Sequence, residues 1–101
     1  MIIFIREGSN KYNHILFTLD TDTGYVRAGN SSILGEVLFN IKDGRIRAGS
    51  SPWGSVIARI DGKYIREGDG PFGTIKYNID GDYIRSGDGL FSRIVANMTT
   101  I

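Results

Sequence analysis

The 101-residue sequence contains no cysteine, which excludes disulfide bonds and thiol chemistry. Its apolar runs are only a few residues long, too short for a helix that crosses a bilayer. It also lacks an excess of charge of one sign, because 12 basic and 11 acidic side chains leave a net charge of +1. A duplex-binding protein usually carries a clear basic excess. We therefore expect neither a membrane nor a nucleic acid as a partner.

We expect no secretory signal at the N-terminus. The opening MIIFIREG has no basic start and becomes charged at Arg6, before a long apolar segment could form. We therefore expect the protein in the cytoplasm. With 41% apolar and 23% charged residues, a chain of this length has room for one domain with a modest core.

Motifs of catalysis and metal binding are missing as well. There is one histidine, His14, and neither a paired-histidine spacing nor a marked nucleophile. The turn from Asp20 to Gly24 (DTDTG) resembles the start of a calcium loop, but position 12 of that loop is Ser31 instead of Glu. We interpret it as a solvated turn. The sequence thus predicts no catalytic residues, no cofactor and no metal site.

Glycine is abundant, with 14 residues, and it marks a repeat. An aliphatic residue followed by Arg-x-Gly occurs five times, at 5–8, 26–29, 46–49, 65–68 and 84–87. Five apolar stretches accompany this motif, at 12–19, 34–41, 53–60, 72–79 and 91–98. The repeating unit is therefore an apolar strand, a turn, a second strand that ends in Arg-x-Gly, and a connector.

One of the five units is split between the chain ends. The units are 12–33, 34–52, 53–71, 72–90, and 91–101 combined with 1–11. We predict a single all-β domain, residues 1–101, of five hairpins and ten strands arranged radially around a small apolar centre. The ring closes if Ile2–Arg6 pairs antiparallel with Ile94–Met98.

Local patterns support hairpins. Ile15, Phe17 and Leu19 alternate with other residues, which is typical of a strand with one buried face. Asp61-Gly62 and Asp80-Gly81 lie between apolar runs and predict tight turns with positive φ at glycine. The glycine after each repeated arginine should also have a positive φ. Asp43-Gly44 comes one position later in its unit, which favours a three-residue loop with a bulge.

Two further apolar sets recur with the unit. The connector residues are predicted to wedge between adjacent hairpins; they are Tyr12, Leu34, Trp53, Phe72 and Phe91. The second set lies on the face opposite the core and is a candidate interface of a homo-oligomer. It consists of Leu16, Leu38, Ile57 and Val95.

The sequences IDGKYIREG (60–68) and IDGDYIRSG (79–87), within this five-part organisation, resemble the bacterial β-flower proteins, which are small hairpin-repeat domains of about this length. The resemblance covers the whole chain. It implies a β-flower fold and no catalytic residues. The best known flower arrangement is four-fold, whereas five units are counted here.

The repeated arginines have two interpretations. As a five-fold set they are candidates for binding a phosphate, a nucleotide or an acidic glycan. In the structural interpretation, each lies over the aromatic residue beside it on the adjacent hairpin, or pairs with Glu7, Glu67, Asp69 or Asp88. The set comprises Arg6, Arg27, Arg47, Arg66 and Arg85.

From these features we expect a non-enzymatic binding or assembly module that forms a homo-oligomer. The alternative is an anion, nucleotide or acidic-glycan receptor that uses the arginine set, and an enzyme is the third possibility. The sequence does not identify a small-molecule ligand.

Overall fold

The computed structural model describes residues 1–31 and 34–100. The ends of two predicted units, residues 32, 33 and 101, lie outside these ranges. The regular structure is ten strands: β1 (Ile2–Glu7), β2 (Ile15–Asp20), β3 (Tyr25–Ala28), β4 (Val37–Lys42), β5 (Arg45–Ala48), β6 (Val56–Asp61), β7 (Tyr64–Glu67), β8 (Ile75–Asp80), β9 (Tyr83–Ser86) and β10 (Ile94–Thr100). Within the described ranges, no helix has the length and apolar character needed to cross a membrane.

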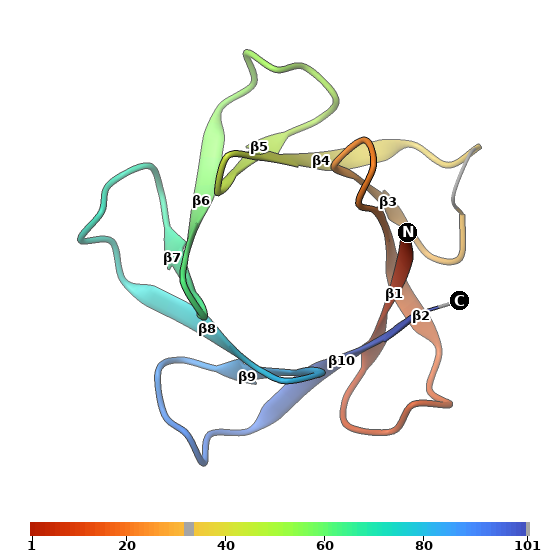
Figure 1. Cartoon of the computed structure of the whole chain (residues 1–101), viewed down its shortest axis with the longest axis vertical. Coiled ribbons are helices and arrows are strands. Elements are labelled where there is room, and N and C mark those ends of the chain that lie inside the picture. The colour runs from red at the N-terminus through yellow and green to blue at the C-terminus, as the bar shows by residue number, and fades with distance from the viewer. Residues whose placement is uncertain (32–33, 101) are drawn as a thin grey trace.

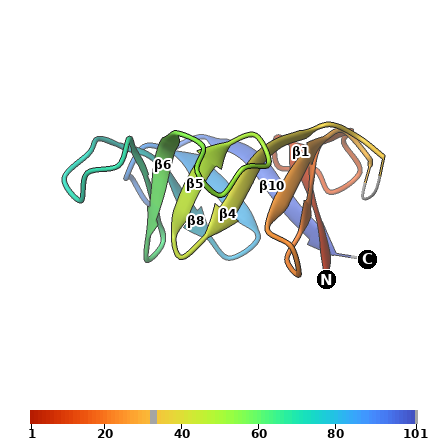
Figure 2. The same ribbon diagram turned by 90° about the horizontal axis from the view of Figure 1, so that it is seen from above.

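The strands form one closed antiparallel barrel in which sequence neighbours pair, and β1 also pairs with β10. Figure 1 shows the resulting ring, with the connectors between hairpins pointing away from it. The ring is flat, with extents of 35 × 34 × 17 Å. The connectors lie toward one rim, and both chain ends lie at the opposite rim (Figure 2). The all-β prediction and the strand count are therefore confirmed.

The pairing of the chain ends is also confirmed. Ile3 lies opposite Thr100, and Ile5 lies opposite Met98. The register is shifted from the predicted match of Ile2–Arg6 with Ile94–Met98, because β10 continues to Thr100. Since β1 is bonded on its other side to β2, the split hairpin leaves no free sheet edge.

The hairpin turns have two central residues each in three of the units. Gly62 and Gly81 both have φ of 60°, as predicted. In the β4–β5 hairpin, Asp43 has φ of 54° and Gly44 has φ of 75°. The predicted three-residue loop is therefore wrong at this site. Aspartate tolerates the left-handed region, so Asp43 takes the place that glycine takes in the other two hairpins.

Each junction between neighbouring hairpins contains a β-bulge. At the β3–β4 junction, Val26 lies opposite Phe39 and Arg27 lies opposite Val37, which leaves Leu38 as the extra residue. Bulges bend a strand and increase its twist, and both effects help a short sheet to close. The extra residues at the five junctions are Leu16, Leu38, Ile57, Lys76 and Val95.

Four of these bulge residues are the candidate interface set. Leu16, Leu38 and Val95 are half-buried, whereas Ile57 is 41% exposed. These residues break the alternation of apolar and polar side chains along their strands. The bulge accounts for this, because it places two successive residues opposite one partner.

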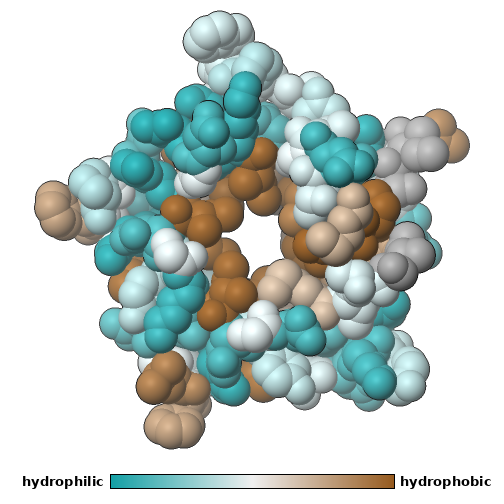
Figure 3. Space-filling model, viewed as in Figure 1, coloured by the Kyte–Doolittle hydropathy of each residue, from teal (hydrophilic) through white to brown (hydrophobic). Residues whose placement is uncertain are grey.

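The prediction of a small apolar centre is wrong, because the apolar side chains line the inside of a ring that is open at its middle (Figure 3). Aliphatic residues lie opposite each other on neighbouring strands, as Ile41 and Ile46 do. The ring centroids of Phe17 and Phe39 are 6.3 Å apart. In the space-filling view, hydrophobic side chains surround a central opening (Figure 3). Among the described apolar residues, only Val26 and Ala96 are fully buried. The core is therefore a thin lining, and stability depends strongly on closure of the sheet.

Candidate functional site

Four of the five connectors share a four-residue turn at their outer end. The amide of the last residue donates to the carbonyl oxygen of the first, at 3.0 Å in 10–13, 3.1 Å in 51–54, 3.4 Å in 70–73 and 3.3 Å in 89–92. A bulky residue occupies the third position of each turn. These residues are Tyr12, Trp53, Phe72 and Phe91.

The prediction that these residues wedge between hairpins is wrong. Tyr12 is 82% exposed, Trp53 90%, Phe72 94% and Phe91 98%, and Leu34 in the remaining connector is 94% exposed. We call these five residues the connector tips. They are displayed because anchoring side chains hold the connector backbone against the sheet, while the turn directs its third residue away.

The repeated arginines supply one anchor for each connector. In every unit the arginine Nη1 donates to a backbone carbonyl seven or eight residues further along. The acceptors are Asn13 at 2.8 Å, Gly54 at 2.9 Å, Gly73 at 3.0 Å and Ser92 at 2.9 Å, together with Gly35. The five-fold recurrence of arginine thus has a structural role.

The remaining arginine contacts differ from those expected. The aromatic ring beside the guanidinium belongs to the same strand, two residues earlier, and not to the adjacent hairpin. The distances to the ring centroid are 5.7 Å for Arg6 over Phe4, 5.8 Å for Arg27 over Tyr25 and 6.0 Å for Arg66 over Tyr64.

The acidic partners also differ. Arg66 Nε lies 3.1 Å from Asp61 and Arg85 Nε lies 3.1 Å from Asp80. Within the described residues, none of Glu7, Glu67, Asp69 and Asp88 forms an ion pair with the five arginines. Each of these aspartates is the last residue of the first strand of its hairpin. It lies opposite the tyrosine that precedes the arginine by two residues, which brings the carboxylate within reach of the guanidinium.

A second set of anchors was not identified from the sequence. Asn40, Asn78 and Asn97 are buried, and each Nδ2 donates to two carbonyl oxygens at the start of a connector. For Asn78 the acceptors are Gly87 at 2.8 Å and Gly89 at 3.2 Å. In the β2 unit, Thr18 Oγ1 donates to Gly29 at 2.6 Å. The sequence signal that could have identified these anchors is the recurrence of a polar residue at the same position of the first strand in each unit, where the neighbouring residues are mostly apolar.

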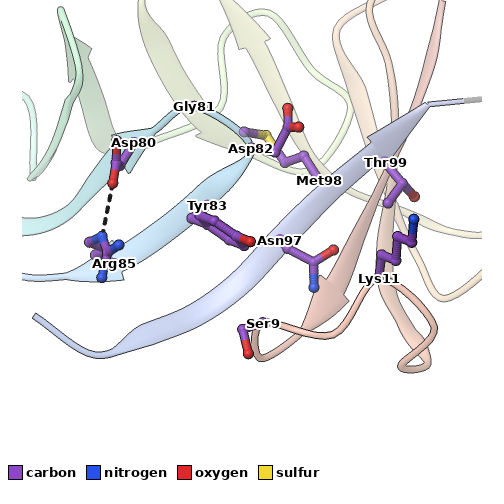
Figure 4. A pocket seen from close by; sticks show the side chains of 10 residues that line it. All are labelled: Ser9, Lys11, Asp80, Gly81, Asp82, Tyr83, Arg85, Asn97, Met98 and Thr99. Atoms are coloured by element: carbon purple, nitrogen blue, oxygen red, sulfur yellow. Dashed lines mark hydrogen bonds and ion pairs between the residues drawn. The ribbon is translucent and has the colours of Figure 1, made fainter.

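Two grooves lie beneath connectors, each against one of these asparagines. The groove in Figure 4 has a volume of about 420 Å³ and contains Tyr83, Asn97 and the Asp80–Arg85 ion pair. Its cations Lys11 and Arg85 are balanced by Asp80 and Asp82.

The other groove, of about 290 Å³, is cationic: Lys42, Arg45 and Arg47 line it with a single carboxylate, Asp43. Its remaining lining is Asn40, Pro52 and Trp53. In the described part of the chain, no group of three or more histidine and acidic residues is placed to hold a metal ion.

The fold defines a class of small all-β proteins built from repeated hairpins that close into a ring. A sequence family described as "6-fold beta flower protein" matches residues 5–100, and the chain belongs to this family. The description refers to six-fold organisation, whereas the ten strands of this chain form five hairpins. Neither the curated proteins nor the solved structures include a match to this chain.

Proposed function

We propose that this protein is a non-enzymatic binding or assembly module that contacts its partner through the connector tips. The observation that carries the proposal is the exposure of all five tips, between 82% and 98%, four of them on turns closed by a backbone hydrogen bond. Side chains needed only for folding would be covered. All five connector tips are exposed, and each unit carries one tip. This arrangement places their side chains for contact with another molecule.

The first partner that we propose is a second copy of the chain. An aromatic side chain buries about 150–250 Å², and a standard interface takes about 800 Å² from each partner. The four aromatic tips together offer about 600–1,000 Å², so an interface of standard size has to engage most of the tips at once. We infer that the hairpins are arranged radially and that two copies face each other through the rim that carries the connectors (Figure 2), so that most tips of one copy contact the other.

The candidate interface residues fit the same surface. The carbonyl oxygens of Leu16, Leu38 and Ile57 accept hydrogen bonds of 2.8, 2.8 and 2.9 Å from the glycines that begin the connectors. These bulge residues thus lie at the base of the connectors, whose outer ends carry the tips. A partner seated on the connectors would cover both sets.

The second candidate is an anion receptor. It is favoured by the equivalent placement of five guanidiniums, each bound to its connector carbonyl through Nη1. The connectors lie outside the ring (Figure 1), so the arginines cannot converge on one small anion. Such a receptor would bind an anion at one unit at a time.

Sedimentation velocity tests the assembly proposal. We expect the wild type to sediment as an oligomer, and the variant Trp53→Ser/Phe72→Ser/Phe91→Ser to be a folded monomer, with a circular dichroism spectrum like that of the wild type. The matched control is Leu90→Ser, because Leu90 is 59% exposed and precedes a tip in the same turn. It should leave the mass unchanged.

A monomeric wild type at about 100 µM would contradict self-assembly, since that concentration exceeds the Kd expected for an interface of this size. An oligomer that persists in the triple variant would exclude the tips as the interface.

A further inference from the structure

Because the five junctions between hairpins are equivalent, the cross-strand residue pair at one junction can be compared with the pairs at the other four. At four junctions an aromatic residue lies opposite a threonine or asparagine, as in the pairs Phe4–Thr18, Tyr25–Asn40, Tyr64–Asn78 and Tyr83–Asn97. At the β5–β6 junction, Arg45 lies opposite Arg59. Like charges directly opposite each other are destabilising. Because four junctions close without this pair, the fold does not require it.

Arg59 holds a connector, whereas Arg45 does not. Arg59 replaces an anchoring asparagine, and its Nη1 donates to the carbonyl oxygen of Asp69 at 3.2 Å. Arg45 anchors no connector backbone. Its Nε lies 3.4 Å from the Asp69 carboxylate, and its side chain is 41% exposed. The terminal nitrogens of Arg45 are therefore available to a ligand.

A third departure from the repeat stands beside Arg45. Lys42 lies opposite Arg45 across the hairpin, at the position that Asp61 and Asp80 hold in their units. Those aspartates pair with the arginines of their own hairpins at 3.1 Å. In the β4–β5 hairpin a lysine stands at that position, so Arg47 lacks the ion pair that Arg66 and Arg85 make.

Two of these departures, Lys42 and Arg45, come together in the cationic groove of about 290 Å³. Among the lining residues, Lys42, Arg45 and Arg47 face one carboxylate, Asp43, and Asp69 outside the lining pairs with Arg45 Nε. Trp53, the only tryptophan of the chain, also lines the groove. The groove of Figure 4 has tyrosine and aspartate at the corresponding strand positions and is balanced in charge. The volume is at the lower end of small-molecule sites.

We propose that this groove binds a tetrahedral oxyanion, phosphate or sulfate, carried by a small molecule with a ring, aromatic or sugar, that packs against an indole. Lys42 supplies a compact positive charge, and the guanidiniums of Arg45 and Arg47 donate to the anion oxygens. The indole of Trp53 stacks on the attached ring. The oxyanion part of the inference does not depend on the connector tips forming an interface, because it rests on Lys42, Arg45 and Arg47, whereas the ring contact uses Trp53, which is itself a connector tip.

Tryptophan fluorescence gives a direct readout, because Trp53 is the only tryptophan. The probes are AMP, glucosamine 6-sulfate, inorganic phosphate and inorganic sulfate, with adenosine as the uncharged comparison. We expect AMP or the sulfated sugar to bind and change the emission, the inorganic ions to compete, and adenosine to bind at least about tenfold more weakly. The stronger of the first two ligands identifies the source of the oxyanion.

The variant Lys42→Asp/Arg45→Tyr restores the residues that other units carry at both positions and removes the Arg45–Arg59 pair of like charges, so it should fold with a melting temperature at least as high as that of the wild type. We expect it to weaken binding roughly tenfold or more, because two charge-assisted contacts are lost. The variant Lys63→Asp/Arg93→Tyr makes the same change in net charge outside the groove and should retain binding. Absence of binding by every probe at millimolar concentration would overturn the proposal, as would equal losses in the two variants.

Discussion

At the scale of single residues, the shape of the connectors depends on buried polar side chains. Asn78 is 1% exposed and holds two carbonyl oxygens of the connector that follows β9. Arg85 holds the carbonyl of Ser92 at the other end of the same connector. Because buried carbonyls need partners, these two residues keep the intervening turn in one conformation and its tip, Phe91, exposed.

Replacement of Asn78 by alanine tests this role. We expect Asn78→Ala to lower the free energy of unfolding by about 1–3 kcal/mol, because two connector carbonyls lose their donor. Urea denaturation followed by circular dichroism measures the change. Asn30→Ala, at an exposed connector position, is the control and should change stability by less than about 0.5 kcal/mol. Equal midpoints for Asn78→Ala and the wild type would contradict the anchoring role.

At the scale of the hairpin and connector elements, glycine is required for two different reasons. Gly81 has φ of 60°, and a Cβ there would meet no atom within 4 Å. The constraint is therefore backbone conformation alone. A Cβ at Gly73 would collide with the backbone carbonyl oxygen of Glu67, so this glycine is needed for close approach of the connector to β7. Asp43 adopts a positive φ without being glycine.

These differences predict a graded series of turn variants. Gly81→Ala should destabilise the protein by about 1 kcal/mol through its backbone conformation. Gly73→Ala should cost more, because the backbone must also move. Asp43→Gly should stay within about 0.5 kcal/mol of the wild type, since relief at positive φ offsets the added entropy of the unfolded chain. Thermal unfolding of the three variants gives the order. If Gly81→Ala melts with the wild type, the turn assignment is incorrect.

At the scale of the whole molecule, closure of the ring replaces a solid core. The lining is thin and surrounds an opening (Figure 3), so each hairpin is supported mainly by its two neighbours. The β1–β10 pair contributes one of these supports although its strands come from opposite chain ends. Loss of one junction would expose two sheet edges.

Two rearrangements separate closure from chain continuity. Deletion of residues 1–7 removes β1, so we expect unfolding or association through the exposed edges of β10 and β2. A circular permutant joins Ile101 to Met1 by a short linker and opens the chain between Gly70 and Pro71. It should remain folded, because every strand pair is retained. Size-exclusion chromatography with circular dichroism distinguishes the outcomes. A deletion variant that keeps the wild-type melting curve would show that closure is dispensable.

The sequence by itself determined the unit, its number and the pairing of the chain ends. These follow from local periodicity: alternation fixes strand faces, Asp-Gly marks the turns, and the first strand at 91–98 had no partner except residues 2–7. The five arginines were found for the same reason, since a unit spacing of about 19 residues repeats them.

Only the tertiary structure decided how the connectors are used. A bulky residue such as Trp53 reads the same in sequence whether it is covered or displayed. Trp53 is 90% exposed on a connector whose backbone is held by Asn40 and Arg47. The connector that carries Tyr12 is held partly from the other end of the chain, because Asn97 donates to the carbonyl oxygen of Asn10. The pair of like charges Arg45 and Arg59, of which Arg45 lines the cationic groove, likewise needed the register, because the two lie 14 residues apart and oppose each other only after β5 and β6 pair across a bulge. Cross-strand neighbours are set by the sheet as a whole, and no local pattern contains them.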